Sequence, residues 1–440
     1  MNLKKLLLWF ILLGQLQFAK ADTFRILDDE KESLQCRIDM TVGAQRELLI
    51  STYIIRLDEV GLGLLQLMVE KAAQGVKVRL ILDAMHNDLP RPLIKYLLEK
   101  NVEIRMYNKV RFLEFHTIID RMHEKVLISD INDVIVGGRN MSKDYYKLDS
   151  ISNFKDREMY AHSQKVGMDL RNHFYLVWNH NKLTNRTKYN RLDDNKRAYW
   201  REQLANALAS LIKKTGITTT AQRDWTVNTN SADIHATYDN FVRKKNGRFQ
   251  PFDRKDRNAT KQLIALIDSA KSSIDFENPY FHPTRRWEKA LNEALKRGVK
   301  IRLVTNSECT NDVLLMQAVY RRSRHKYLKM GIQIWEYEGK ECLHTKSIVI
   351  DSIITVIGSY NIHIVSEKNN TEVCLWVKDA AIGNQSIDLM NGYLASSKNI
   401  AVTKTNLSKR LIGYNEACRD KRLRYCLYVR LLAPFLSLVM

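Results

Sequence analysis

Residues 121–140 read RMHEKVLISDINDVIVGGRN, and residues 342–361 read CLHTKSIVIDSIITVIGSYN. Both stretches contain the pattern His-x-Lys-x-x-x-x-Asp, followed by a turn of small residues that ends in Asn. The matching residues are His123, Lys125, Asp130, Gly137, Gly138 and Asn140 in the first stretch, and His344, Lys346, Asp351, Gly358, Ser359 and Asn361 in the second. Each member of the second set lies 221 positions after its counterpart, and none of the other histidines among the 11 begins the full pattern. The repeat indicates two copies of one structural unit.

The duplication extends beyond the two motifs. Residues 72–83 (AAQGVKVRLILD) are echoed by residues 295–306 (LKRGVKIRLVTN), and each stretch predicts a helix that ends near Gly and a strand that follows it. Further strands are predicted at 48–55, 102–107, 274–281 and 332–337, and further helices at 93–100 and 313–330. Strands that alternate with helices are typical of a sheet covered on both faces. The sequence therefore predicts an α/β protein of two pseudo-symmetric α-β-α halves with mixed sheets, in which each motif forms a hairpin.

Composition divides the chain into five predicted parts. These are a signal peptide at 1–21, an N-terminal half at 22–214, a basic linker or loop at 215–258, a C-terminal half at 259–400 and a tail at 401–440 that packs on the domain or on a membrane surface. Residues 1–21 combine two lysines, an apolar run and Ala-Lys-Ala, which is typical of a secretory signal. The apolar run is too short to span a bilayer. We therefore expect a secreted or periplasmic protein, with an uncleaved anchor as the alternative.

The net charge of +21 predicts an anionic partner, either a phospholipid surface, a nucleic acid or a polyanionic substrate. Basic runs at 243–255 and 320–327 could bind anions or could be solvated faces. Phe249 and Phe252 lie within the first run, an arrangement that would suit single-stranded nucleic acid. Charge alone therefore leaves the class of partner open. The six cysteines form no CxxC pair or Cys/His cluster typical of zinc, so no metal or cofactor is expected.

The paired motifs fit the chemistry of phosphodiester transfer. Near neutral pH one imidazole can be neutral and attack phosphorus while a second is protonated and gives its proton to the leaving alkoxide. The Lys two residues after each His would lie on the same strand face and stabilise the phosphate oxygens. Asn140 and Asn361 would supply neutral donors, and the small residues Gly138 and Ser359 would let the backbone turn beside the substrate.

A histidine in this role usually has its other nitrogen held by a carboxylate. Within the C-terminal half we expect Glu372 to hold His344, and within the N-terminal half Asp156 or Glu158 to hold His123. Asp130 and Asp351 belong to the motifs but stand at the far end of each strand. We therefore expect these two aspartates to hold the hairpins and to take little direct part in the chemistry.

The doubled HxKxxxxD motif with GGxN and GSxN resembles the phospholipase D superfamily, closest to its bacterial phospholipase D and cardiolipin synthase branch. The resemblance covers nearly the whole chain after residue 21. It implies an active site at the interface of the halves, with the catalytic residues His123, Lys125, Asp130, His344, Lys346 and Asp351. It also implies a metal-free reaction through a phosphohistidine intermediate. By analogy, His123 is the nucleophile and His344 is the acid.

The match has one departure. After Asn361 the cardiolipin synthase branch usually shows Asp, Pro and Arg before a Ser, whereas this chain has His363, Ile364 and Val365. His363 is either an additional substrate contact or a satisfied histidine behind the site. The departure favours hydrolysis of glycerophospholipids to phosphatidic acid. Phosphatidyl transfer, as in cardiolipin synthase, a secreted endonuclease and a non-catalytic binding protein are the alternatives. We expect an anionic phospholipid surface as the partner, nucleic acid less so, and a monomer that forms an internal pseudo-dimer.

Overall fold

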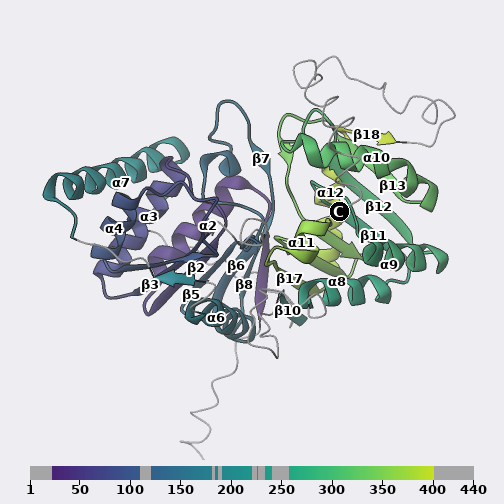
Figure 1. Ribbon diagram of the computed structural model, residues 1–440. Coiled ribbons are helices and arrows are strands. Elements are labelled where there is room, and N and C mark those ends of the chain that lie inside the picture. Colours follow the sequence, from purple (N-terminus) through teal and green to yellow (C-terminus); the bar gives the residue numbers. More distant parts are fainter. Residues whose placement is uncertain are drawn as a thin grey trace, which may run out of the picture.

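A computed structural model describes residues 22–109, 120–180, 184–186, 191–220, 225, 233–239 and 257–400. These residues form two lobes that lie side by side, one from each half of the chain (Figure 1). The first lobe contains a mixed sheet in the order β1-β8-β6-β5-β2-β3-β4-β9, and the second a sheet in the order β10-β17-β16-β15-β11-β12-β13-β18. Corresponding strands occupy corresponding positions through most of both sheets, so the predicted duplication and the α/β class are confirmed.

The N-terminal lobe follows the predicted alternation of strands and helices. Its elements are β1 (Thr23–Leu27), α2 (Glu30–Gly43), β2 (Glu47–Thr52), α3 (Glu59–Ala73), β3 (Lys77–Asp83), α4 (Arg91–Glu99), β4 (Val102–Tyr107), β5 (Val126–Ser129), β6 (Asp133–Gly137), the 3-10 helix η1 (Lys143–Tyr146), β7 (Phe154–Lys155), β8 (Glu158–His162), α6 (Gln164–Asn179), β9 (Thr184–Arg186) and α7 (Asp194–Thr215). The motif hairpin is formed by β5 and β6, which are antiparallel. Strands β2 and β3 are parallel, as expected for strands joined by a helix.

The C-terminal lobe repeats this plan. Its elements are β10 (Asp233–Tyr238), α8 (Asn258–Ser269), β11 (Ser273–Glu277), α9 (Arg285–Lys296), β12 (Lys300–Asn306), α10 (Leu314–Met330), β13 (Gln333–Tyr337), β14 (Cys342–Leu343), β15 (Ser347–Ile350), β16 (Ile354–Gly358), α11 (Ile364–Lys368), β17 (Val373–Lys378), α12 (Ala380–Leu394) and β18 (Ser397–Ile400). The second motif hairpin is formed by β15 and β16. Strand β14 leaves the lobe and pairs in parallel with β7 of the other lobe.

Apolar side chains form three main cores. Helices α2, α3 and α4 bury their apolar faces against the outer face of the first sheet, and α8, α9 and α10 do so against the second. The third core lies between the two sheets, where Val136 and Met159 of the first sheet join Ile357 and Leu375 of the second. This shared core therefore packs the two sheets against each other.

The stretch predicted as a linker is more than a loop, which corrects the boundary at 259. Strand β10 lies within it and pairs with β17, so the second sheet begins before residue 259. Trp225 is buried in the first lobe, where its indole N–H donates to Asp39 at 3.0 Å. Pairing at a sheet edge leaves a weak sequence signal because most side chains of β10 are polar or only partly buried.

The predicted signal peptide and the predicted tail fall outside the described residues and stay predictions. Within the part of the chain that the structure describes, no helix has both the length and the apolar character needed to cross a bilayer.

Candidate active site

The two His-x-Lys segments lie at the interface of the halves. Strands β5 and β15 begin only at Val126 and Ser347, so the prediction that the first strand already includes His123 is wrong. The backbone N–H of His123 donates instead to the carbonyl of Thr371 in the other half at 3.1 Å, and Thr371 N–H donates to the Arg121 carbonyl at 2.9 Å. A short ladder between the halves therefore positions the first histidine.

The second histidine is positioned in the same way. Its backbone N–H donates to the carbonyl of Lys155 in the N-terminal half at 2.7 Å, and Cys342 N–H donates to the Asn153 carbonyl at 2.9 Å. These bonds extend the pairing of β14 with β7. The residues just before β5 and β15 therefore pair with a segment of the opposite half. For this reason their backbone does not continue the sheet of their own half.

Two residues that the sequence reasoning missed anchor these segments. The Asp83 carboxylate accepts from the backbone N–H of Met122 at 3.1 Å, and the side-chain amide oxygen of Asn306 accepts from the backbone N–H of Leu343 at 2.9 Å. Asp83 and Asn306 end the repeated strands β3 and β12. A polar residue at the carboxyl end of both copies of a repeated strand was the available signal, because such ends commonly carry functional groups in α/β sheets.

Each motif histidine is paired with a carboxylate from the opposite half. Nδ1 of His123 lies 2.9 Å from Oε2 of Glu372, and Nδ1 of His344 lies 2.6 Å from Oδ2 of Asp156. The prediction that Glu372 holds His344 and that Asp156 or Glu158 holds His123 is therefore wrong. Asp156 and Glu372 do occupy equivalent positions. Gly137 pairs with Glu158 on β8 and Gly358 pairs with Cys374 on β17, and each of the two carboxylates lies two residues before that partner. Because these positions lie at the interface, their side chains reach across it.

Glu158 has a structural role away from the histidines. Its carboxylate is fully buried and accepts from the guanidinium of Arg37, with Nε at 3.2 Å, and from the hydroxyl of Ser33. Both partners belong to α2, so this carboxylate attaches that helix to β8. The equivalent position on β17 is Cys374. Proximity in sequence to Asp156 therefore does not make Glu158 a member of the centre.

The two small motif residues Gly138 and Ser359 serve the two carboxylates differently. A Cβ atom at Gly138 would lie 2.3 Å from both carboxylate oxygens of Asp156, so only glycine lets this carboxylate approach. Ser359 instead donates its hydroxyl to Oε2 of Glu372, and Ser366 donates to Oε1. Burial alone would raise the pKa of Glu372, but His123, Lys125 and these hydroxyl contacts outweigh it and the pKa is lowered. Glu372 is therefore ionised beside His123.

Both motif lysines are buried in the centre. Lys125 Nζ donates to the carbonyl of His123 at 2.6 Å and lies 5.0 Å from the centroid of the Tyr53 ring. Lys346 Nζ lies 2.7 Å from Nδ1 of His344 and 3.7 Å from Asp156. Burial lowers the pKa of Lys125 to about 7 and also lowers that of Lys346. An anion bound beside Lys125 would favour its ammonium form, because an opposite charge favours the ionised form.

The histidines are neutral at pH 7 in the unliganded protein. His123 and His344 are only 7% and 5% exposed, and this burial lowers the pKa of His123 to about 4 and also lowers that of His344. With Nδ1–H donated to Glu372, the neutral ring of His123 keeps a lone pair on Nε2. Nδ1 of His344 lies beside both Asp156 and the Lys346 ammonium, so its tautomer depends on which of the two it bonds. Among the described residues neither Nε2 atom has a hydrogen-bond partner, so both are available to a substrate.

Asn140 and Asn361 are buried behind the small-residue turns. The amide of Asn140 donates to the hydroxyl of Tyr145 at 2.9 Å. Within the described part of the chain, the side-chain oxygen of each asparagine is buried without a partner. These unpartnered atoms are acceptors, so they do not by themselves bind a phosphate oxygen. The role of the two asparagines as donors to phosphate oxygens stays a prediction.

The motif aspartates Asp130 and Asp351 lie at the opposite end of the strands from the histidines. Their carboxylates accept from successive backbone N–H groups, those of Gln45, Arg46 and Glu47 for Asp130, and those of Lys271, Ser272 and Ser273 for Asp351. Both therefore hold the start of the neighbouring strand, β2 or β11. These bonds support a structural role, but they join the hairpin to the neighbouring strand, and over the described residues neither carboxylate is hydrogen-bonded to a motif histidine or lysine.

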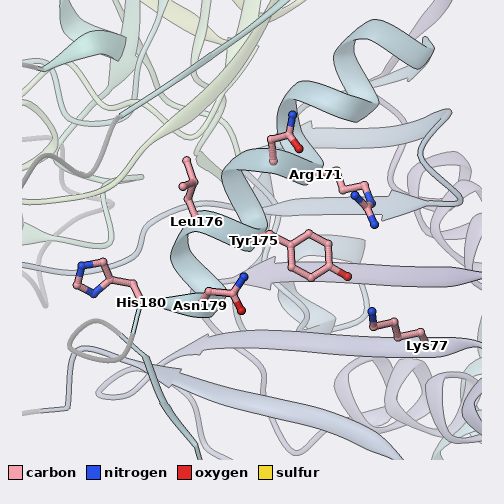
Figure 2. A pocket seen from close by; sticks show the side chains of 7 residues that line it. Lys77, Arg171, Tyr175, Leu176, Asn179 and His180 are labelled. Atoms are coloured by element: carbon pink, nitrogen blue, oxygen red, sulfur yellow. The ribbon is translucent and has the colours of Figure 1, made fainter.

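An open pocket of about 700 Å³ lies at this same distant end of the first sheet (Figure 2). It is lined by Lys77, Arg171, Asn172, Tyr175, Leu176, Asn179 and His180. Arg171 is paired with Glu47, which also accepts from the hydroxyl of Tyr175 at 3.0 Å. The pocket therefore contributes no group to the histidine centre.

Comparisons with known proteins agree with this geometry. The family model described as "Cardiolipin synthase, PLD-like domain" matches residues 38–171 and 263–393, one segment in each half. An uncharacterized protein of Helicobacter pylori (strain ATCC 700392 / 26695) is 25% identical over 384 residues, which cover 79% of this chain and 74% of that protein. Cardiolipin synthase 2 of Bacillus anthracis is 26% identical over 409 residues, 91% of this chain and 70% of that protein. A solved phosphatidylserine synthase of Haemophilus influenzae Rd KW20 covers 95% of both chains with a TM-score of 0.66 and 12% identity, a likeness of fold.

Proposed function

Because the chain belongs to the phospholipase D-like family, whose domain matches both of its halves, we propose that it transfers the phosphatidyl group of a glycerophospholipid to an acceptor alcohol. The family and its relatives make the chain an enzyme of the phosphodiesterase and phosphatidyltransferase type. The observation that carries the proposal is the reciprocal pairing of His123 with Glu372 and of His344 with Asp156.

In the first step Nε2 of His123 attacks phosphorus. The bond to the head-group oxygen breaks, and His344 gives that oxygen its Nε2 proton, so that the head-group alcohol leaves and phosphatidyl-histidine forms. His344 must be protonated for this step, and the negative charge of the bound phosphodiester favours its imidazolium form. Lys125 and Lys346 stabilise the non-bridging oxygens in the transition state.

In the second step the neutral His344 takes the proton of an acceptor hydroxyl. The acceptor oxygen attacks phosphorus, the bond to His123 breaks, and the product leaves. A hydroxyl of a second lipid gives a lipid product, whereas water gives phosphatidic acid. The two reactions therefore differ only in the acceptor.

One observation supports a lipid acceptor over water, which reverses the order expected from the motif alone. Several relatives that cover most of this chain are named cardiolipin synthases. The substitution of His363, Ile364 and Val365 for the usual Asp, Pro and Arg concerns the surroundings of the histidines and leaves both dyads intact.

Four exposed apolar side chains suggest how the site meets a bilayer. We call Leu57, Met85, Ile151 and Val313 the apolar rim; Ile151 is 93% exposed and the others 38–49%. Exposed side chains of this kind mark interaction surfaces when they gather in one place.

Each member of the apolar rim lies close in sequence to a residue of the site's wall. Leu57 follows Tyr53 by four residues, and Met85 precedes His86; the Tyr53 ring lies 5.0 Å from the ring of His123 and 4.5 Å from that of His86. On the other side, Ile151 and Val313 flank residues beside His344. Phe154 lies 5.2 Å from the His344 ring, and Asp312 accepts from the hydroxyl of Tyr280 at 2.6 Å. We infer that the apolar rim inserts into an anionic phospholipid surface from which the substrate enters. We also infer that residues 1–21 act as a secretory signal, so that the protein meets this surface outside the cytoplasm.

The proposal is tested by incubating the full-length protein with phosphatidylglycerol vesicles, or phosphatidylcholine vesicles, in the presence of EDTA and identifying the products by mass spectrometry. Cardiolipin from phosphatidylglycerol is the expected product, and the matched control is the His123→Asn variant. Phosphatidic acid alone would show that water is the acceptor. Unchanged lipids together with cleavage of plasmid DNA would replace the proposal with an endonuclease.

A further inference from the structure

A third histidine belongs to the centre without being part of either motif. His363 follows Asn361 by two residues and is the N-cap of the short helix α11, where its Nδ1 accepts from the backbone N–H of Ser366 at 3.1 Å. Asp, Asn, Ser and Thr are the favoured N-cap residues because their short side chains accept this bond at low cost. Capping alone therefore does not explain a buried imidazole at this position.

His363 is connected to both motif histidines. The residue that it caps, Ser366, donates its hydroxyl to Glu372, which in turn holds His123. On its other side, the ring centroid of Tyr280 lies 6.3 Å from that of His363 and 6.1 Å from that of His344. The third imidazole is thus part of the same wall as the reacting groups.

The hydrogen bond at Nδ1 determines the tautomer of His363. A neutral imidazole that accepts at Nδ1 carries its proton on Nε2. Burial lowers the pKa of His363 to about 4, so this neutral form persists at pH 7. The arrangement is opposite to that of His123, whose Nδ1 faces a carboxylate and whose Nε2 is bare. His363 can therefore donate from Nε2 but cannot act as a second nucleophile.

The Nε2–H group of His363 is not used within the protein. No group among the residues that the structure describes is hydrogen-bonded to it, and the side chain keeps a small exposed area, with the residue 7% exposed. We propose that Nε2–H of His363 donates a hydrogen bond to an oxygen of the bound phosphodiester, which makes His363 a substrate-binding residue. The inference rests on the proposed function for the identity of the substrate as a phosphodiester, but it does not require a lipid.

The test uses three variants that all retain a side-chain oxygen for the N-cap. His363→Asn keeps the cap through its oxygen and can donate through its amide. His363→Asp keeps the cap but has no donor, and His363→Ser keeps the cap with a hydroxyl too short to reach the position of Nε2. Their kcat/KM is measured with the soluble bis(4-nitrophenyl) phosphate and with phosphatidylglycerol vesicles, and their thermal midpoints with the full-length protein.

We expect His363→Asn to stay within a few-fold of the parent, and His363→Ser and His363→Asp to lose roughly ten- to a hundredfold in kcat/KM at unchanged thermal midpoints, as for loss of one bond to a charged oxygen. Equal activity of all three variants would overturn the proposal, as would an Asn variant as impaired as the Ser variant. If the Ser and Asp variants unfold, the proposal is tested on the parent protein by NMR. The ¹⁵N signal of His363 Nε2 should then shift when vanadate binds, and an unchanged signal would overturn the proposal. Turnover of the soluble diester without turnover of lipid would refute the lipid assignment and leave this inference intact.

Discussion

Nδ1 of His123 lies 2.9 Å from Oε2 of Glu372, although 249 positions separate the two residues in the chain. His344 and Asp156 form the reciprocal pair across 188 positions. Neither half therefore supplies the carboxylate for its own motif histidine, and each half depends on the other for this contact. The shared core between the sheets is what makes this dependence possible.

The crossed pairing predicts which carboxylate supports which histidine. In Glu372→Gln the amide cannot stabilise an imidazolium or select the Nδ1–H tautomer of His123, so we expect formation of the phosphoenzyme to slow by roughly 10²–10⁴-fold. Rapid-quench labelling with a ³²P-phospholipid measures this step. Asp156→Asn should impair protonation of the leaving alcohol, so it should lose less activity with a substrate whose leaving group, such as 4-nitrophenol, needs no proton. The same sensitivity to leaving group in Glu372→Gln would contradict the assignment.

Glu158→Gln is the matched control for these two variants. This carboxylate is buried like the other two but contacts Arg37 and Ser33. We expect a loss of about 1–3 kcal/mol in the free energy of unfolding, because a buried guanidinium loses its charged partner, and an unchanged preference for leaving groups.

The two histidines should be separable in a trapping experiment. We expect His123→Asn and His344→Asn each to abolish steady-state turnover, and only the His344→Asn protein to accumulate labelled phosphoenzyme when the leaving group is 4-nitrophenol. EDTA should change neither the parent rate nor the labelling, because the proposed steps use only imidazole and ammonium groups. Label retained in His123→Asn but lost in His344→Asn would exchange the two roles.

The motif aspartates should affect stability and spare chemistry. Asp130→Ala removes an acceptor from three backbone N–H groups at the start of β2, so we expect urea unfolding to show a loss of about 1–3 kcal/mol. Asp130→Asn retains an oxygen and tolerates the positive φ of 49°, so it should lose less. Turnover per folded molecule should stay within a few-fold in both. A loss of turnover comparable to that of His123→Asn would place Asp130 in the chemistry.

Buried neutral histidines make the protein less stable in acid. His123 and His363 have folded pKa values of about 4 against an ordinary value of 6.5, so between these values the unfolded chain binds more protons than the folded one. The free energy of unfolding should therefore decrease as the pH is lowered, by about 2 kcal/mol per histidine from pH 7 to pH 5. Urea titrations at both pH values measure the fall, and His363→Asn should show a smaller one. Equal stability at pH 7 and pH 5 in the parent would refute this account.

The apolar rim should govern binding to vesicles. We expect Ile151→Asp to weaken sedimentation with phosphatidylglycerol vesicles by roughly tenfold, the free energy of one buried aliphatic side chain, and to leave hydrolysis of bis(4-nitrophenyl) phosphate unchanged. Ile353→Asp is the control, because Ile353 is also exposed, at 40%, but lies in the turn beside Asp351 at the far end of the strands. Equal binding by the two variants would show that the rim does not face the membrane.

The repeated pattern predicted much of the fold and the reacting groups. The hairpins β5–β6 and β15–β16 and the parallel strands β2, β3, β11 and β12 lie close to where periodicity and glycines placed them. The edge strand β10 was assigned to a linker because most of its side chains are polar or only partly buried, and the edge strand β1 was missed although most of its residues are buried. The anchors Asp83 and Asn306 were missed because a polar residue at the end of a strand has no meaning until its backbone partner is known.

The residue order was enough to establish that the pattern of histidine, lysine and asparagine occurs twice and that each copy belongs to one of two similar α/β units, because periodicity and spacing can be read along the chain. The folded structure was needed to establish which carboxylate holds which histidine, that Glu158 attaches α2, and that His363 lies in the same centre. These contacts join residues from opposite halves or from separate elements. They depend on how the two sheets pack against each other, and the distance between residues along the chain carries no information about that packing.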